Sequence, residues 1–293
     1  MKYCVKFYKQ FRYNDIVDEI IYKYNEFGDE LPKRIADMNW TQKQRIIIDV
    51  CDINEEEDIL PIILMCFKKH PYSVVRLDLK QEIIADKLRE GHFPFFYSEH
   101  FCTMDGIYGA VVRGVTDVYV TESLGFRIKD VYEFCHKNKI KVRVIPNIAQ
   151  YKPGFKNEIP DEFKFFIRPE DVKIYEEYVD VMEFIAPEDR MSILFEIYKN
   201  GRWLGDLKEL IVGLNEPLSN TALIPYFGES RINCGQRCLF DKCRLCNHMY
   251  IMATEFDKNN LEIKKPKDEE WIKETKAYKE AMQIAEKSDI ENK

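Results

Sequence analysis

Short apolar runs of strand length alternate with helical patterns along most of this 293-residue chain, and this alternation limits the fold more than any other feature. Repeated strand and helix units imply parallel strands joined by helical crossovers. Eight such strands can close into an α/β barrel of the (β/α)8 TIM-like type, which is the fold we predict. An open doubly wound sheet is the main alternative, and the lack of a helical pattern between Asn147 and Lys164 counts against both folds. The predicted strands are residues 3–8, 45–52, 73–79, 93–99, 117–122, 140–147, 164–169 and 180–186.

Helices are predicted where apolar residues recur every three or four positions. Residues 14–27 follow this rule, since Ile16, Val17, Ile20 and Ile21 fall at helical spacing. In the next helical pattern, residues 55–69, Pro61 indicates a kink or a late start. The other predicted helices are residues 81–91, 104–114, 127–139, 171–178, 191–200 and 206–214.

Charge and targeting signals narrow the class of protein. The net charge of -7 and the pI near 5.5 argue against a strongly basic nucleic-acid-binding protein. They do not exclude a local cationic patch. The N-terminus lacks the apolar core of a signal peptide, and no apolar run reaches the roughly 18 residues that span a membrane. We therefore expect a cytoplasmic protein with no membrane partner.

The nine cysteines form two groups. Cys4, Cys51, Cys66, Cys102 and Cys135 are scattered through apolar segments, which favours buried thiols in a reducing compartment over a disulfide framework. The other four lie within thirteen residues near the C-terminus. We therefore divide the chain into a barrel at 1–215, a four-cysteine metal-binding segment at 216–262 and a charged helical tail at 263–293.

The four clustered cysteines predict a metal centre. Cys234, Cys238, Cys243 and Cys246 follow the spacing C-x3-C-x4-C-x2-C, so four thiolates can reach one centre. The last three have the spacing of the contiguous part of the plant-type ferredoxin motif, which favours an iron–sulfur cluster. Zinc is the alternative, although zinc ribbons usually place about 15 to 20 residues between their cysteine pairs.

Basic residues surround the cysteines. Arg231, Arg237, Lys242 and Arg244 favour thiolate over thiol and would offset the negative charge of a four-cysteine centre. The same side chains could contact RNA or another nucleic acid, a second role that the sequence leaves open.

Polar residues at the ends of predicted strands are the candidates for catalysis, because barrel enzymes place their chemistry there. Charges inside apolar strands are costly unless they are paired, so these side chains are either functional or parts of a salt-bridged barrel interior. His100 follows a strand end, where an imidazole can transfer a proton or can serve only to cap a helix. The candidates are Asp49, Arg76, Asp78, His100, Glu122 and Arg168.

Two stretches resemble a known family. GVTDVYV at residues 114–120 and VRVIPN at 142–147 lie within residues 98–150, and RPEDV and EDRM lie within 165–203. Together these stretches cover about a third of the chain, and they resemble the U32 "peptidase" family. That resemblance implies a barrel scaffold and, in several branches, a four-cysteine [4Fe-4S] cluster used in oxygen-independent hydroxylation of RNA bases or of a quinone precursor. The family's cysteines are more widely spaced, so the ligands here are assigned from their own spacing.

The sequence thus predicts an iron–sulfur barrel protein that carries out a redox or modifying reaction on an unidentified substrate. Two alternatives stay open: a barrel with a structural zinc site and no redox role, and a nucleic-acid-binding module.

Overall fold

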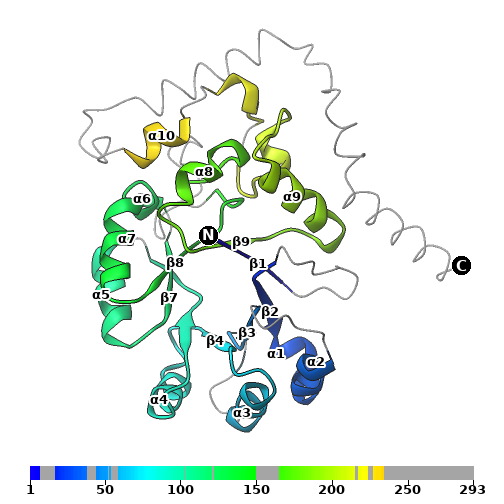
Figure 1. Cartoon of the computed structure of the whole chain (residues 1–293), viewed down its shortest axis with the longest axis vertical. Helices are drawn as coiled ribbons and strands as arrows, with labels where there is room; N and C mark the ends of the chain where they lie inside the picture. The colour runs from blue at the N-terminus through cyan, green and yellow to red at the C-terminus, as the bar shows by residue number, and fades with distance from the viewer. Residues whose placement is uncertain are drawn as a thin grey trace, which may run out of the picture.

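The computed structural model describes residues 1–6, 17–37, 44–51, 53, 59–101, 103–120, 122–149, 165–214, 217–223 and 227–233. In this part of the chain nine parallel strands form one sheet in the order β5-β4-β3-β2-β1-β9-β8-β7-β6. Figure 1 shows that the sheet curls and that the helices lie on its outer, convex side. The strands are β1 (Lys2–Lys6), β2 (Glu19–Lys23), β3 (Arg45–Asp49), β4 (Val74–Leu77), β5 (Phe95–Tyr97), β6 (His100–Phe101), β7 (Asp117–Val120), β8 (Lys141–Val144) and β9 (Val181–Phe184).

The two ends of this sheet lie next to each other. Only Ser98 and Glu99 separate β5 from β6, although these strands stand at opposite ends of the hydrogen-bonded order. Two residues span only a few ångströms, so the sheet has to curl until its ends meet. The backbone N–H of Thr116, just before β7, also donates to the carbonyl of Phe95 in β5 at 3.0 Å. The fold is therefore barrel-like, and the open doubly wound alternative does not fit these connections.

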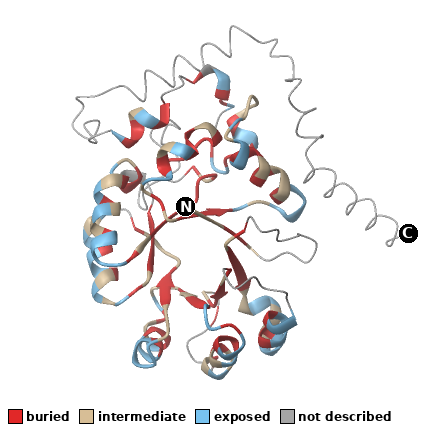
Figure 2. Cartoon of the chain, viewed as in Figure 1, coloured by how far each residue is buried: buried red, intermediate tan, exposed pale blue. Residues whose placement is uncertain are grey.

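Helices cover the convex face with their apolar sides. Figure 2 shows buried residues on the sides of the helices that face the sheet and exposed residues on their outer sides. In α4, for example, Ile84, Ala85 and Leu88 are buried, and in α7 Ile128, Val131 and Cys135 are buried. The helices are α1 (Tyr24–Phe27), α2 (Leu31–Asp37), α3 (Leu60–Lys69), α4 (Glu82–Glu90), α5 (Met104–Val112), α6 (Glu122–Gly125), α7 (Ile128–Lys137), α8 (Val172–Tyr175), α9 (Glu188–Asn200) and α10 (Phe227–Ile232), with short 3-10 turns η1 (Gly28–Glu30), η3 (Pro169–Asp171), η4 (Leu207–Glu209) and η5 (Asn220–Ala222).

Most predicted elements are confirmed, and three predictions are wrong. Residues 14–27 were expected to be helical, but β2 occupies their centre, and only the last four residues form α1. Of the strand expected at 164–169, Phe165 forms a single bridge and the next three residues are irregular. The helix expected at 206–214 is reduced to the three residues of η4. Pro61 stands in the first turn of α3, so the late helix start is confirmed.

Within the described residues, no helix is both long enough and apolar enough to cross a bilayer.

Candidate functional site

The concave face of the curled sheet carries buried charged side chains. Successive residues of a strand point to opposite faces, so one set of alternate positions meets the helices and the other set faces inward. Three arginines, four carboxylates and one tyrosine occupy inward positions on six strands. They are Glu19 in β2, Arg45 and Asp49 in β3, Arg76 in β4, Asp117 and Tyr119 in β7, Arg143 in β8 and Glu183 in β9.

The first group of these charges centres on Arg143, whose side chain is fully buried. Its guanidinium pairs with the carboxylate of Glu19 and donates from Nε to Asp117 at 3.1 Å. Arg45 binds both oxygens of the same Asp117, at 2.9 and 3.0 Å, and lies 3.4 Å from Glu19. Two arginines therefore share two carboxylates that come from distant positions in the sheet order. Such a buried group is tolerated only while every charge keeps its partners.

The second group centres on Arg76. Its guanidinium donates to Asp49 at 2.5 Å and to Glu183 at 3.1 Å. The hydroxyl of Tyr119 accepts from Arg76 at 3.2 Å and itself donates to Glu183. The ring of His100 lies 5.1 Å from the ring of Tyr119. This group lies nearer the carboxyl ends of the strands, since Asp49 is the last residue of β3.

Burial and the positive charge of Arg76 set the protonation states of the titratable side chains in and next to the second group. Burial alone would raise the pKa of Asp49, but the charge of Arg76 and the hydrogen bonds from Arg76 and Cys51 together lower that pKa below its ordinary value. Burial, and then the charge of Glu183, raise the pKa of the Tyr119 phenol well above its usual range. Burial and the charge of Asp49 likewise raise the pKa of the Cys51 thiol. Asp49 therefore stays ionised near neutral pH, whereas Tyr119 and Cys51 stay neutral.

A partly exposed rim of polar residues follows the carboxyl ends of β4 and β5. The hydroxyl of Ser98 donates to Asp78 at 3.0 Å, and Asp78 also pairs with Lys80 at 3.3 Å. Glu99 accepts from the backbone N–H of Leu79 at 2.7 Å, and burial raises the pKa of its carboxyl group. A carboxyl group with a raised pKa can give a proton to a bound molecule, and this is the edge at which barrel enzymes carry their chemistry.

Four of the six catalytic candidates lie in or beside this region. Asp49 and Arg76 form the ion pair, His100 packs on the ring of Tyr119, and Asp78 stands on the rim. Glu122 is the first residue of α6, and its side chain lies outside the described part of the chain.

Arg168 lies elsewhere and has the contacts of a structural residue. It is 2% exposed and donates to Asp171 from Nε at 2.7 Å and from Nη2 at 2.9 Å. Its guanidinium also lies 5.0 Å from the centre of the Phe227 ring, in α10. These contacts join η3 to α10.

The structure corrects the expectation that Arg231 contacts nucleic acid. This side chain is 1% exposed, and its guanidinium lies 4.2 to 5.3 Å from the ring centres of Phe126, Phe166 and Phe227. Cation–π contacts of this kind hold the arginine inside the protein. The three other expected basic contacts, Arg237, Lys242 and Arg244, lie outside the described residues.

The four metal-ligand candidates, Cys234, Cys238, Cys243 and Cys246, also lie outside the described residues. Asn233 is the residue just before the first of them, and its side chain accepts a hydrogen bond from the Lys129 amine at 2.5 Å. Within the described residues, no three His, Cys, Asp or Glu side chains are arranged to hold a metal ion.

Several members of the charged network went unnoticed in the sequence. Glu19 was assigned to a helix, and Arg45, Asp117 and Arg143 were not singled out. The available signal was a charged residue among apolar strand residues: Arg143 in KVRV of β8 and Asp117 in DVYV of β7.

No family model matches this chain, and no curated protein is similar enough to count as a relative. Its function therefore has to be argued from its own residues.

Proposed function

We propose that this chain is an iron–sulfur enzyme related to the U32 type, in which Cys234, Cys238, Cys243 and Cys246 hold one cluster beside a barrel. The observation that carries the proposal is the spacing of these four cysteines, which begin immediately after an anchored helix. Four thiolates with basic neighbours suit the charge and ligand preference of a [4Fe-4S] cluster. Such a cluster supplies one-electron transfer.

The proposed scaffold is a (β/α)8 barrel. β5 and β6 are separated by two residues and pair on opposite sides, β5 with β4 and β6 with β7. If β5 and β6 are counted as the two halves of one bent strand, the sheet has eight strands instead of nine. These eight strands follow one another around the sheet in the order of the sequence. Eight parallel strands in that order are the arrangement of a TIM barrel.

The position of α10 supports a cluster near the active edge of such a barrel. In Figure 1, α10 lies close to α6 and α8, and α6 follows the carboxyl end of β7. Phe126, just after α6, packs against Arg231 of α10. The last described residue before the cysteines, Asn233, therefore lies on the side where the strands end, which is where an enzyme of this fold binds its substrate.

The protein's own residues have distinct roles in this proposal. Arg76, held by Asp49 and Glu183, is a guanidinium fixed in orientation beneath the site. Glu99, whose pKa is raised by burial, is the proton donor of the rim. The unpaired thiols of Cys4, Cys66 and Cys135 suit a reducing, cytoplasmic setting.

Cysteine variants purified without oxygen test the proposal. Cys238→Ser and Cys243→Ser should lose the brown colour and the visible absorption of an iron–sulfur cluster, because each change removes one thiolate ligand. Cys66→Ala and Cys135→Ala are matched controls, since both thiols are buried on helices that pack on the barrel, and they should keep the absorption. A colourless wild-type protein with one zinc ion per chain would instead support the structural-zinc alternative.

A further inference from the structure

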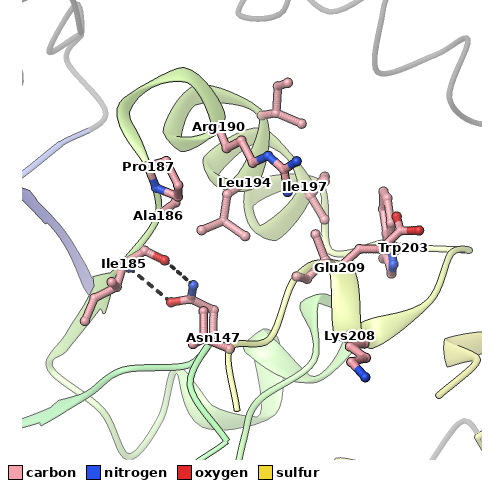
Figure 3. Close-up of a pocket in the computed structure, with 13 residues that line it drawn as sticks. Asn147, Ile185, Ala186, Pro187, Arg190, Leu194, Ile197, Trp203, Lys208 and Glu209 are labelled. Carbon is pink, nitrogen blue, oxygen red and sulfur yellow. Dashed lines mark hydrogen bonds between the residues drawn. The ribbon is translucent and has the colours of Figure 1, made fainter. Parts of the chain in front are cut away.

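A second feature at the carboxyl ends of the strands is a pocket of about 590 Å³. It opens beside the ends of β8 and β9, between α9 and the segment that runs through η4 (Figure 3). This volume lies in the range typical of small-molecule sites. No residue of the charged network lines it, so the two features are separate.

On the floor of the pocket, the polar atoms of the Asn147 side chain are already hydrogen-bonded. Asn147 is 1% exposed, and its amide nitrogen donates to the carbonyl of Ile185 while its oxygen accepts from the N–H of Ile185, at 2.5 and 3.1 Å. Figure 3 shows both bonds. The two polar ends of this side chain are therefore used to join β8 to β9. Ile185 itself is 40% exposed beside the pocket.

One wall of the pocket is a face of α9. Arg190, Leu194 and Ile197 follow one another at four and three residues, the spacing that puts side chains on one side of a helix. Figure 3 shows the three side by side along this wall. Two of them are aliphatic, so the wall is apolar with a single cation at one end.

The opposite wall is also apolar and is held in place. The indole N–H of Trp203 is bonded to the carbonyl of Asp206 at 3.1 Å, which leaves the ring as an apolar surface. Val212 is fixed by backbone bonds to Asn147 and Ala149, at 2.9 and 2.7 Å, and yet its side chain is 58% exposed. Gly213 follows at φ +91°, a conformation that turns the chain away and that suits glycine.

Three charged residues line the pocket: Arg190, Lys208 and Glu209. Lys208 and Glu209 each have another interaction partner, and Figure 3 shows the Lys208 amine pointing away from the α9 wall. Arg190 is exposed, and its guanidinium has no ion-pair partner in the part of the chain that the structure describes. An unpaired guanidinium next to an apolar surface is suited to a ligand that combines a hydrocarbon body with a carboxylate.

We propose that this pocket binds a small organic carboxylate with an apolar body, its anionic group on Arg190 and its hydrocarbon part against Leu194, Ile197 and Trp203. That the ligand is the enzyme's substrate rests on the proposed function. Binding itself does not, because the pocket is built without the cysteine segment.

Calorimetric titration of the full chain tests this proposal with four defined probes. Decanoate and 2-naphthoate share the carboxylate and differ in an aliphatic or aromatic body, and 1-decanol and 2-naphthalenemethanol are their neutral counterparts. We expect at least one carboxylate to bind about tenfold more tightly than its neutral counterpart, a difference of about 1.4 kcal/mol. The better of the two carboxylates identifies the body that the pocket prefers.

Two variants with matched controls place the binding in this pocket. Arg190→Gln should weaken carboxylate binding about tenfold and change binding of the neutral probes less than about twofold. Val212→Glu should weaken carboxylate binding at least as much, because it adds a negative charge at the mouth. Val112→Glu, at a position 87% exposed on α5, and Lys33→Gln on α2 are the controls and should leave the affinities unchanged. Thermal unfolding of each variant verifies that it is folded.

The proposal is overturned if neither carboxylate binds, if the neutral probes bind as tightly, or if the controls weaken binding as much as the pocket variants. Its failure can be told apart from failure of the iron–sulfur proposal. Cys238→Ser should keep carboxylate affinity, and Arg190→Gln should keep the visible absorption of the cluster.

Discussion

At the scale of single residues, Arg143 is the most deeply buried of the three inward-facing arginines. It is fully buried between Glu19 and Asp117, and its loss would leave both carboxylates short of a counter-charge. We predict that Arg143→Met lowers the free energy of unfolding by about 3–5 kcal/mol, the usual result of breaking a buried ion pair. Urea unfolding at neutral pH measures this change.

An exposed arginine provides the control. Arg34 pairs with Glu30 on the surface of α2, with half or more of each side chain exposed. Arg34→Met should change the free energy of unfolding by well under about 1 kcal/mol, because exposed pairs contribute little. Equal losses in the two variants would show that the buried network does not stabilise the sheet.

The same residues predict an acid dependence of stability. Burial would raise the pKa of Asp117, but the charges of Arg45 and Arg143 outweigh it and hold that pKa well below its usual range. Arg76 has the same effect on Asp49. A carboxyl whose pKa is lower in the folded state adds stability above its unfolded pKa of about 3.9, and this stability is lost as the pH falls toward the folded value.

We therefore expect the free energy of unfolding to decrease as the pH falls below about 4–5. In Asp117→Asn this decrease should be smaller, while stability at pH 7 should already be lower. Chemical unfolding across that pH range measures both effects. An unchanged slope in the variant would contradict the assignment of a low pKa to Asp117.

At the scale of elements, α10 depends on close packing against η3. A Cβ on Gly228 would overlap the side chain of Asp171, which is bonded to Arg168. We predict that Gly228→Ala destabilises the protein by about 1–3 kcal/mol, as overpacking usually does. It should also weaken cluster retention in the proposed enzyme, because the cysteines follow α10 directly.

Gly109 in α5 is the matched position, since a Cβ there would meet no atom within 4 Å. Gly109→Ala should leave stability unchanged or raise it by up to about 1 kcal/mol, because alanine favours a helix over glycine. Thermal melts of the two variants compare them directly. A Gly228→Ala protein as stable as Gly109→Ala would mean that α10 does not pack as described.

The elements also show what the sequence could predict. Long amphipathic patterns such as residues 81–91 and 127–139 were read correctly, because their apolar residues keep one period over three turns. β2 was missed because Ile20 and Ile21 fit a helical spacing as well as a strand, and because the partners that make Glu19 acceptable inside the sheet, Arg45 and Arg143, are distant in the sequence. A local pattern cannot contain those long-range partners.

At the scale of the whole molecule, residues far apart in the sequence meet on the concave face. Asp49, Arg76 and Asp78 could be predicted as candidate site residues, because each is a charged residue in or beside an apolar strand. Their meeting with Tyr119 and Glu183 could not, because it depends on how the sheet curls. The carboxylate pocket escaped prediction for the same reason, since its walls come from segments that begin at residues 147, 185 and 203.

The central claim for the whole molecule is that its four clustered cysteines hold an iron–sulfur cluster. Determination of iron, acid-labile sulfide and zinc in one preparation of the full chain, purified without oxygen, tests it most directly. We expect about four iron and four sulfide per chain and little zinc, as for one [4Fe-4S] cluster. Stoichiometric zinc without sulfide, or no bound metal at all, would contradict it.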